Sequence, residues 1–160
     1  MNRMKFCLAF AIAAASPTLA DDVPFAAPPL VSPGLPSAPS ATLGDIMGKL
    51  QLRHIKLWFA IKSRNWDLTD YELGQMRDSF ENAVILYRNI PVELIASATN
   101  PLITLQAAAK AKDFAKAERG FTELTVACNA CHKAAQIGFI TIQTPTSSPF
   151  ADQAFSPLKN

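Results

Sequence analysis

Apolar side chains that recur every three or four residues constrain the fold of this chain more than any other feature of its sequence. After Thr42 the spacing is 3-4-3-4, which is typical of an amphipathic helix packed in a bundle. This first stripe consists of Met47, Leu50, His54, Leu57 and Ile61. No strand-like run of substance precedes residue 137. The pattern therefore predicts an all-α fold, a four-helix bundle over residues 42–136.

The first two helices are predicted to lie antiparallel to each other. Asn65 closes the first helix, and Asp67 together with Asp70 is expected to cap the second. Because the connection between the two helices is short, the chain has to reverse its direction there. The stripe of the second helix consists of Leu73, Met76, Phe80, Val84 and Tyr87.

Proline and polar residues delimit the other two helices. Pro91 ends or kinks the chain, so residues 91–99 are expected to form a short helical turn of their own. Asn100-Pro101 is a favourable start for the third helix, since proline suits the first helical position. Asp113 is expected to cap the last helix. The stripe of that helix consists of Phe114, Ala117, Phe121, Leu124 and Cys128.

A five-residue motif near the C-terminus points to covalent haem attachment. The chain reads Cys128-Asn129-Ala130-Cys131-His132, which is C-x-x-C-H. On a helix, residues at i, i+3 and i+4 share one face, so both sulfur atoms and the imidazole point the same way. The two thiols can add to the haem vinyl groups, and His132 can bind the iron. The motif predicts one haem c per chain.

Other uses of the cysteine pair agree less well with the sequence. A thioredoxin-like C-x-x-C opens a helix after a strand, whereas this pair follows about fifteen residues of helical pattern. A zinc site would need Cys128, Cys131, His132 and His54 together, at a spacing that is unusual for zinc. A disulfide between Cys128 and Cys131 is the third alternative.

The N-terminus predicts export from the cell interior. Two basic residues precede the apolar run 6–15, and a small-residue cleavage site ends at Ala20. The apolar run has about half of the ~20 residues that a membrane span needs, so no transmembrane segment is expected. Residues 1–20 are therefore predicted to be a signal peptide. The expected location is the bacterial periplasm, on the side of the membrane where haem is attached to such motifs.

Proline-containing segments flank the helical region on both sides. Residues 21–41 contain six prolines, favour extended conformations and are expected to form a disordered leader. Residues 137–160 are expected to form an extended tail, in which 138–142 is a candidate extended piece. Phe150 and Phe155 in this tail either fold back over the haem edge or stay loose.

A haem motif on the last helix of a four-helix bundle resembles the class II cytochromes c, the group of cytochromes c′ and c-556. The resemblance covers residues 43–136, and Cys128, Cys131 and His132 match the haem motif of that family residue by residue. In most small soluble cytochromes c the motif lies near the N-terminus, whereas here only 28 residues follow His132. The resemblance implies a periplasmic haem protein, either a low-spin electron carrier or a five-coordinate protein that meets small gases.

Three residues outside the motif are candidates for the second axial ligand of the iron. The favoured one is His54, because the resemblance implies a distal residue from the first helix. A histidine on an apolar face is otherwise a core residue whose ring is hydrogen-bonded. Met47 lies two turns earlier on the same stripe and is the alternative ligand, while Met76 is expected in the core.

The predicted function is one-electron transfer with redox partner proteins, because an iron with two protein ligands keeps no open position. The alternative is a five-coordinate haem protein that binds NO or CO. Peroxidase-like catalysis is disfavoured, since Arg53 points about 100° away from His54 on the helix and supplies no evident acid–base pair. Without residues 1–20, fifteen basic residues become thirteen, which equals the thirteen acidic ones and argues against nucleic-acid binding. The sequence leaves homodimer formation open.

Overall fold

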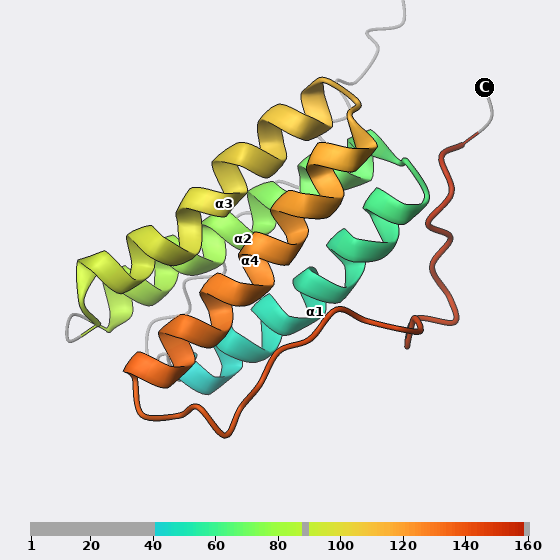
Figure 1. The fold of residues 1–160 in the computed structure, drawn as a ribbon. Coiled ribbons are helices and arrows are strands. Elements are labelled where there is room, and N and C mark those ends of the chain that lie inside the picture. The colour runs from blue at the N-terminus through green and yellow to red at the C-terminus, as the bar shows by residue number, and fades with distance from the viewer. Residues whose placement is uncertain (1–40, 88–89, 159–160) are drawn as a thin grey trace, which may run out of the picture. The chain divides into compact units, whose positions relative to one another are not determined.

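The structure, a computed structural model, describes residues 41–87 and 90–158 of the 160-residue chain. Within this part the fold has four helices and no strands (Figure 1), so the prediction of an all-α four-helix bundle is confirmed. The helices are α1 (Leu43–Lys62), α2 (Trp66–Leu86), α3 (Val92–Lys110) and α4 (Phe114–Ala134). The predicted signal peptide 1–20 and residues 21–40 of the predicted leader lie outside the described residues.

One apolar core lies between the four helices. Met76 belongs to it, as the sequence predicts. Among neighbouring helices, α3 packs closely on α4 and α1 on α2, whereas α1 and α4 pack least closely. No helix in the described part of the chain combines the length and the hydrophobicity that a membrane crossing requires. The largest fully buried apolar side chains are Phe121, Leu57, Ile61, Leu73, Met76, Leu102, Leu105 and Leu124.

Side chains cap the starts of α1 and α4. The Thr42 hydroxyl accepts a hydrogen bond from the Asp45 N–H at 3.2 Å, and the Asp45 carboxylate accepts one from the Thr42 N–H at 2.8 Å. This reciprocal capping box satisfies two backbone donors that have no partner inside the helix. Asp113 caps α4 as predicted, accepting from the Lys116 N–H at 3.0 Å.

The start of α2 differs from the prediction that Asp67 and Asp70 cap it. The Asn65 side chain occupies the cap position and accepts a hydrogen bond from the Leu68 N–H at 3.2 Å. Asp67 lies in the first turn instead, where a carboxylate interacts favourably with the helix dipole. The helix therefore begins two residues earlier than a cap at Asp67 would allow.

The prediction of a separate turn over 91–99 followed by a helix from Pro101 is wrong. α3 is one continuous helix with Pro101 in its interior. An interior proline lacks an N–H donor and costs roughly 3 kcal/mol. Burial offsets this cost, because one apolar stripe runs across the proline into the core. The buried residues of this stripe are Ala98, Leu102 and Leu105.

Three helices end in the same kind of chain reversal. Arg64, Lys112 and Gln136 follow α1, α3 and α4 with positive φ angles of 54°, 53° and 61°. After α4 the Ile137 N–H donates to the His132 carbonyl at 2.9 Å, which is the long bond of a Schellman motif. Glycine usually occupies the left-handed position because a Cβ is disfavoured there. The reversals are thus formed at some backbone cost.

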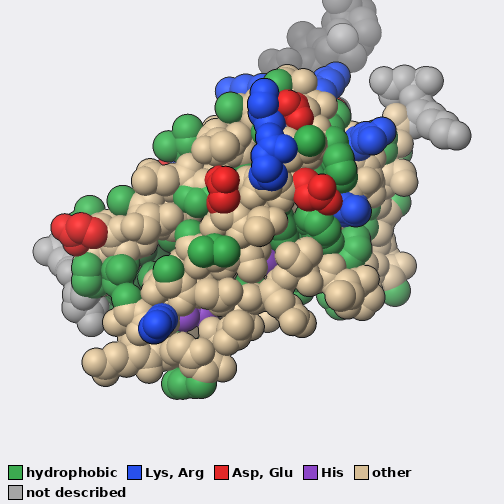
Figure 2. Space-filling model, viewed as in Figure 1, with side chains coloured by type: hydrophobic (Ala, Val, Ile, Leu, Met, Phe, Trp, Pro, Cys, Tyr) green, Lys and Arg blue, Asp and Glu red, His purple; other side chains and the backbone are tan. Residues whose placement is uncertain are grey.

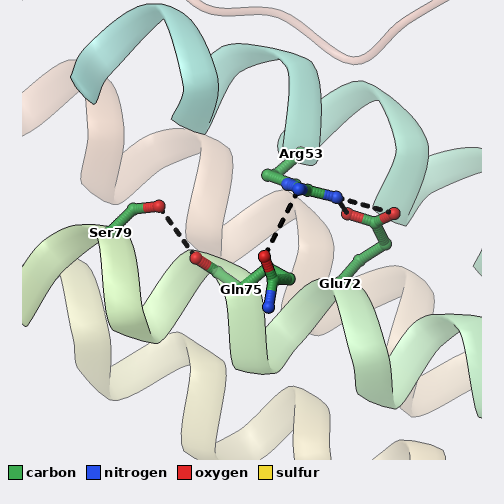
Figure 3. A network of polar contacts seen from close by, with 4 residues as sticks. All are labelled: Arg53, Glu72, Gln75 and Ser79. Carbon is green, nitrogen blue, oxygen red and sulfur yellow. Dashed lines mark hydrogen bonds and ion pairs between the residues drawn. The ribbon is translucent and has the colours of Figure 1, made fainter. Parts of the chain in front are cut away.

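A buried polar network joins α1 to α2 (Figure 3). Glu72 on α2 is 1% exposed, and its carboxylate accepts a hydrogen bond from Arg53 Nη1 on α1 at 3.1 Å. Arg53 Nη2 also donates to Gln75 Oε1 at 3.3 Å. A buried carboxylate is strongly destabilising without such a partner. The network therefore fixes how α1 lies on α2, and α1 carries two of the candidate ligands.

Candidate functional site

The first and last helices, α1 and α4, run antiparallel, and three contacts define their register. Moving up α1 by four residues corresponds each time to moving back along α4 by three or four residues. The contacting pairs are His54–Thr125 (Nε2 to Oγ1, 2.8 Å), Trp58–Phe121 (ring centroids, 4.8 Å) and Lys62–Glu118 (Nζ to Oε1, 3.7 Å).

Continuing the same register by two turns beyond its last contact, His54–Thr125, pairs the level of Met47 on α1 with that of His132 on α4. Met47 precedes His54 by seven residues, and His132 follows Thr125 by seven. Seven residues are two helical turns, about 10 Å, and return to the same face of a helix. The pair Met47 and His132 is therefore related to the pair His54 and Thr125 by a two-turn step along both helices. Met47 is half-buried against the core, and His132 is half-buried as well.

His54 has the surroundings of a hydrogen-bonded core residue. Its side chain is 3% exposed, and its ring centroid lies 4.4 Å from that of Phe121. The Thr125 hydroxyl donates to the Phe121 carbonyl at 2.9 Å, so it accepts from the Nε2–H of His54. Burial lowers the pKa of His54 to about 4, which keeps the ring neutral at pH 7. The ligand role of His54 stays a prediction.

Cys128 and Cys131 lie in the last turns of α4 and are half-buried free thiols. Burial raises the pKa of Cys128 to about 11, with a further contribution from Cys131, and burial also raises the pKa of Cys131. A redox-active pair of the thioredoxin kind instead lies at a helix N-terminus, where the dipole stabilises a thiolate. The end of α4 has the opposite polarity, so the site does not resemble a dithiol redox centre.

The zinc alternative needs His54 beside the motif, and the register separates them. His54 lies about two turns away from the level of His132 along the helices. In the described ranges there is no cluster of three or more His, Cys, Asp or Glu side chains arranged to hold a metal ion. The four residues that sequence counting assembled for zinc are therefore not brought together.

The imidazole of His132 has one nitrogen engaged by the backbone. Its Nδ1 lies 2.8 Å from the Ile140 carbonyl oxygen. A carbonyl only accepts, so Nδ1 carries the proton and Nε2 of the neutral ring keeps its lone pair. Metal-binding histidines almost always donate their other N–H to an acceptor of this kind. Two thiols and an Nε2 lone pair from one end of a helix form a donor set that fits a covalently attached haem.

The tail after α4 folds back over α4 and α1. The Asn129 side chain makes two hydrogen bonds to the backbone of Ile142, one to its carbonyl and one from its N–H, both 2.8 Å long. Residues 138–142 do not form a strand, and all of them except the half-buried Ile142 are exposed. Figure 2 shows histidine at the surface of the face along which the tail runs. The later contacts are Lys56–Phe150 (Nζ to centroid, 4.6 Å), Phe59–Phe155 (centroids, 5.6 Å) and Asn65–Phe155 (Nδ2 to O, 3.1 Å).

Sequence reasoning missed three groups that belong to this site. Thr125 lies one turn before Cys128 on the same face, and a polar residue on an apolar stripe is a signal that could have found it. Asn129 occupies a position of the motif at which many side chains are compatible with haem attachment. The third group is the carbonyl oxygen of Ile140, and a backbone acceptor leaves no trace in the sequence.

Comparisons of this chain with protein-family models, with curated proteins and with solved structures find no match. The resemblance to the class II cytochromes c therefore rests on the motif and its place in the bundle.

Proposed function

We propose that this chain is an exported mono-haem c-type cytochrome that carries single electrons between redox partner proteins. Cys128 and Cys131 hold the haem as thioethers, and His132 binds the iron through Nε2. Each thiol adds its S–H across one vinyl double bond, so attachment loses no atom and needs no oxidant. The observation that carries the proposal is a C-x-x-C-H motif at one end of a helix, with Nδ1 of its histidine engaged by a backbone carbonyl.

When bound, a haem of this kind supplies a reversible one-electron couple. The residues of the chain hold and shield it. His132 presents Nε2 because the Ile140 carbonyl holds its Nδ1–H. Burial of Cys128 raises the pKa of its thiol, so one of the two attachment points lies in surroundings of low polarity.

The register favours Met47 over His54 as the second axial ligand. The continued register brings Met47 to the level of His132, whereas His54 lies two turns away and would have to give up its hydrogen bond to Thr125. Leaving that position would also remove the His54 ring from Phe121 in the core. A thioether ligand raises the reduction potential relative to a second histidine.

Attachment is tested by producing the protein with haem-maturation machinery in a bacterial periplasm and separating it by denaturing electrophoresis. Haem should stay with the wild type and with an Ala130→Ser control, which changes the motif at an exposed position. The double variant Cys128→Ala, Cys131→Ala should lose haem completely. Haem that survives denaturation in the double variant would contradict covalent attachment.

The sixth position is tested by optical spectra of the oxidised and reduced protein. The wild type and a His54→Ala variant should be low-spin, whereas Met47→Ala should be high-spin and react with CO. The reverse pattern in the two variants would assign the ligand to His54. A wild type that is already high-spin and binds NO or CO would replace electron transfer by the gas-binding function.

A further inference from the structure

Asn129 is the only side chain in the described part of the molecule that ties the haem motif to the tail through two hydrogen bonds. Its Nδ2 donates to the Ile142 carbonyl and its Oδ1 accepts from the Ile142 N–H, both at 2.8 Å. An amide that pairs with both polar groups of one residue fixes that residue in position and in orientation. The proposed attachment chemistry assigns no role to Asn129.

The clamped residue lies two positions after the carbonyl that holds His132. The chain leaves α4 through the reversal at Gln136 and makes a turn in which the Ile140 N–H donates to the Ile137 carbonyl at 2.9 Å. This turn brings the Ile140 carbonyl back to within 2.8 Å of His132 Nδ1. Asn129 then binds Ile142, so the carbonyl is held from both sides along the chain.

Apolar burial does little to hold this loop. Phe139 is 84% exposed and Ile140 is 46% exposed, so their side chains contribute few core contacts. An exposed carbonyl with no restraint on its position would exchange His132 for water. The hydrogen bonds from Asn129 therefore provide the restraint that packing does not.

We infer that Asn129 is a positioning residue for His132. By clamping Ile142 it keeps the Ile140 carbonyl on Nδ1–H and holds the ring in the tautomer whose Nε2 carries a lone pair. The inference rests on the proposed haem function for its consequence, but the tautomer itself is a property of the chain without haem. In the haem protein, a ring that donates from Nδ1 is a stronger ligand and favours oxidised over reduced iron.

The first experiment uses the protein without haem and ring ¹⁵N NMR of His132 at a pH where the ring is neutral. In the wild type Nδ1 should carry the proton. In Asn129→Ala the population should shift toward the Nε2–H form, and amide exchange at Ile142 should become at least tenfold faster. Gln143→Ala, an exposed tail side chain next to Ile142, should leave both signals unchanged.

Two further variants keep the test decisive if Asn129→Ala is poorly folded. Asn129→Asp keeps the acceptor for the Ile142 N–H and loses the donor, and Ile142→Pro loses the N–H while Asn129 stays. Each should shift the tautomer in the same direction. The effects of Asn129→Ala and Ile142→Pro should not add, because both break one clamp.

The second experiment measures the reduction potential of the haem-loaded variants. Asn129→Ala should favour the reduced form about tenfold over the wild type, which is about 59 mV for one electron. A wild type that fails to bind haem would refute the proposed function, while the NMR result would still decide the role of Asn129. If every variant attaches haem covalently but neither the His132 tautomer nor the reduction potential changes, the inference about Asn129 is wrong. The proposed function would stand in that case.

Discussion

α4 meets its two neighbours in different ways, and two consecutive residues show the difference. Gly120 faces α3, where the Cβ that it lacks would lie 3.0 Å from Leu105 Cγ. Phe121 faces α1, with its ring centroid 4.4 Å from that of His54 and 4.8 Å from that of Trp58. A missing side chain lets α3 and α4 approach closely, whereas aromatic rings fill the space between α1 and α4.

The two sides of α4 therefore differ in how much room they leave for a bound group. The α3 interface is closed by backbone proximity and leaves little room for any added group. The α1 interface is wider, and the candidate residues Met47 and His132 are half-buried at one end of it. We therefore expect changes on the α3 side to alter stability alone. Under the proposed function, changes on the α1 side should alter both stability and the properties of the attached haem.

The largest expected effect comes from Phe121→Ala, which removes the aromatic ring that α4 places against α1. Phe121 is fully buried, so its truncation should lower the free energy of unfolding by about 3–5 kcal/mol through lost burial and a residual cavity. Urea unfolding of the protein without haem measures this change. Val126→Ala, an exposed position on the same helix, should cost far less. A loss below about 1 kcal/mol would mean that the rings do not hold the two helices together.

A second test on the α1 side uses the pH dependence of stability without haem. Burial lowers the pKa of His54 to about 4 from an unfolded value near 6.5, so the unfolded state binds more protons between these values. The stabilisation is complete above pH 6.5 and is lost as the pH falls toward 4, by on the order of 3 kcal/mol. His54→Gln should lack this component. Parallel pH profiles for the two proteins would contradict a buried neutral His54.

The α3 side is tested by Gly120→Ala. The new methyl group would press against Leu105, and overpacking of this kind costs about 1–3 kcal/mol, partly offset by roughly 1 kcal/mol of helix propensity. Gly74→Ala is the matched control, because its Cβ would meet no atom within 4 Å. That control should gain about 0.5–1 kcal/mol. Thermal unfolding of both variants shows whether the close approach of the helices or helix propensity decides the sign of the change in stability at Gly120.

Local sequence signals predicted the helices well, because each carries an apolar stripe that survives in the folded core. They failed at Pro101, where local preference indicates a helix start and burial of Ala98 and Leu102 instead carries the helix through. They also placed the cap of α2 at Asp67, although Asn65 is equally able to accept the N–H. Tertiary packing decided the first position. At the second, two nearby side chains can both cap the helix, and a local pattern does not show which of them does.

The part of the candidate site that could be predicted is the part whose residues lie close together in the sequence. That Cys128, Cys131 and His132 lie together at the end of one helix follows from their spacing, and their role in binding haem stays a prediction. The choice between His54 and Met47 depends on the register of α1 against α4, which is a long-range property of two helices that share the same stripe. The carbonyl of Ile140 reaches His132 only because the chain reverses after α4. Sequence periodicity contains no information about that return path.

The smallest expected effect is at Lys112, which lies in the turn that joins α3 to α4. Its φ of 53° disfavours a Cβ, and the turn is closed by the Asp113 N–H donating to the Ala108 carbonyl at 3.0 Å. Lys112→Gly should relieve the strain and raise the free energy of unfolding by about 0.5–1 kcal/mol. Lys112→Ala keeps a Cβ and should bring no gain, which separates backbone strain from loss of the charge. Equal stabilisation by both variants in urea unfolding would show that the lysine charge, rather than the left-handed backbone, limits how tightly α3 and α4 are joined.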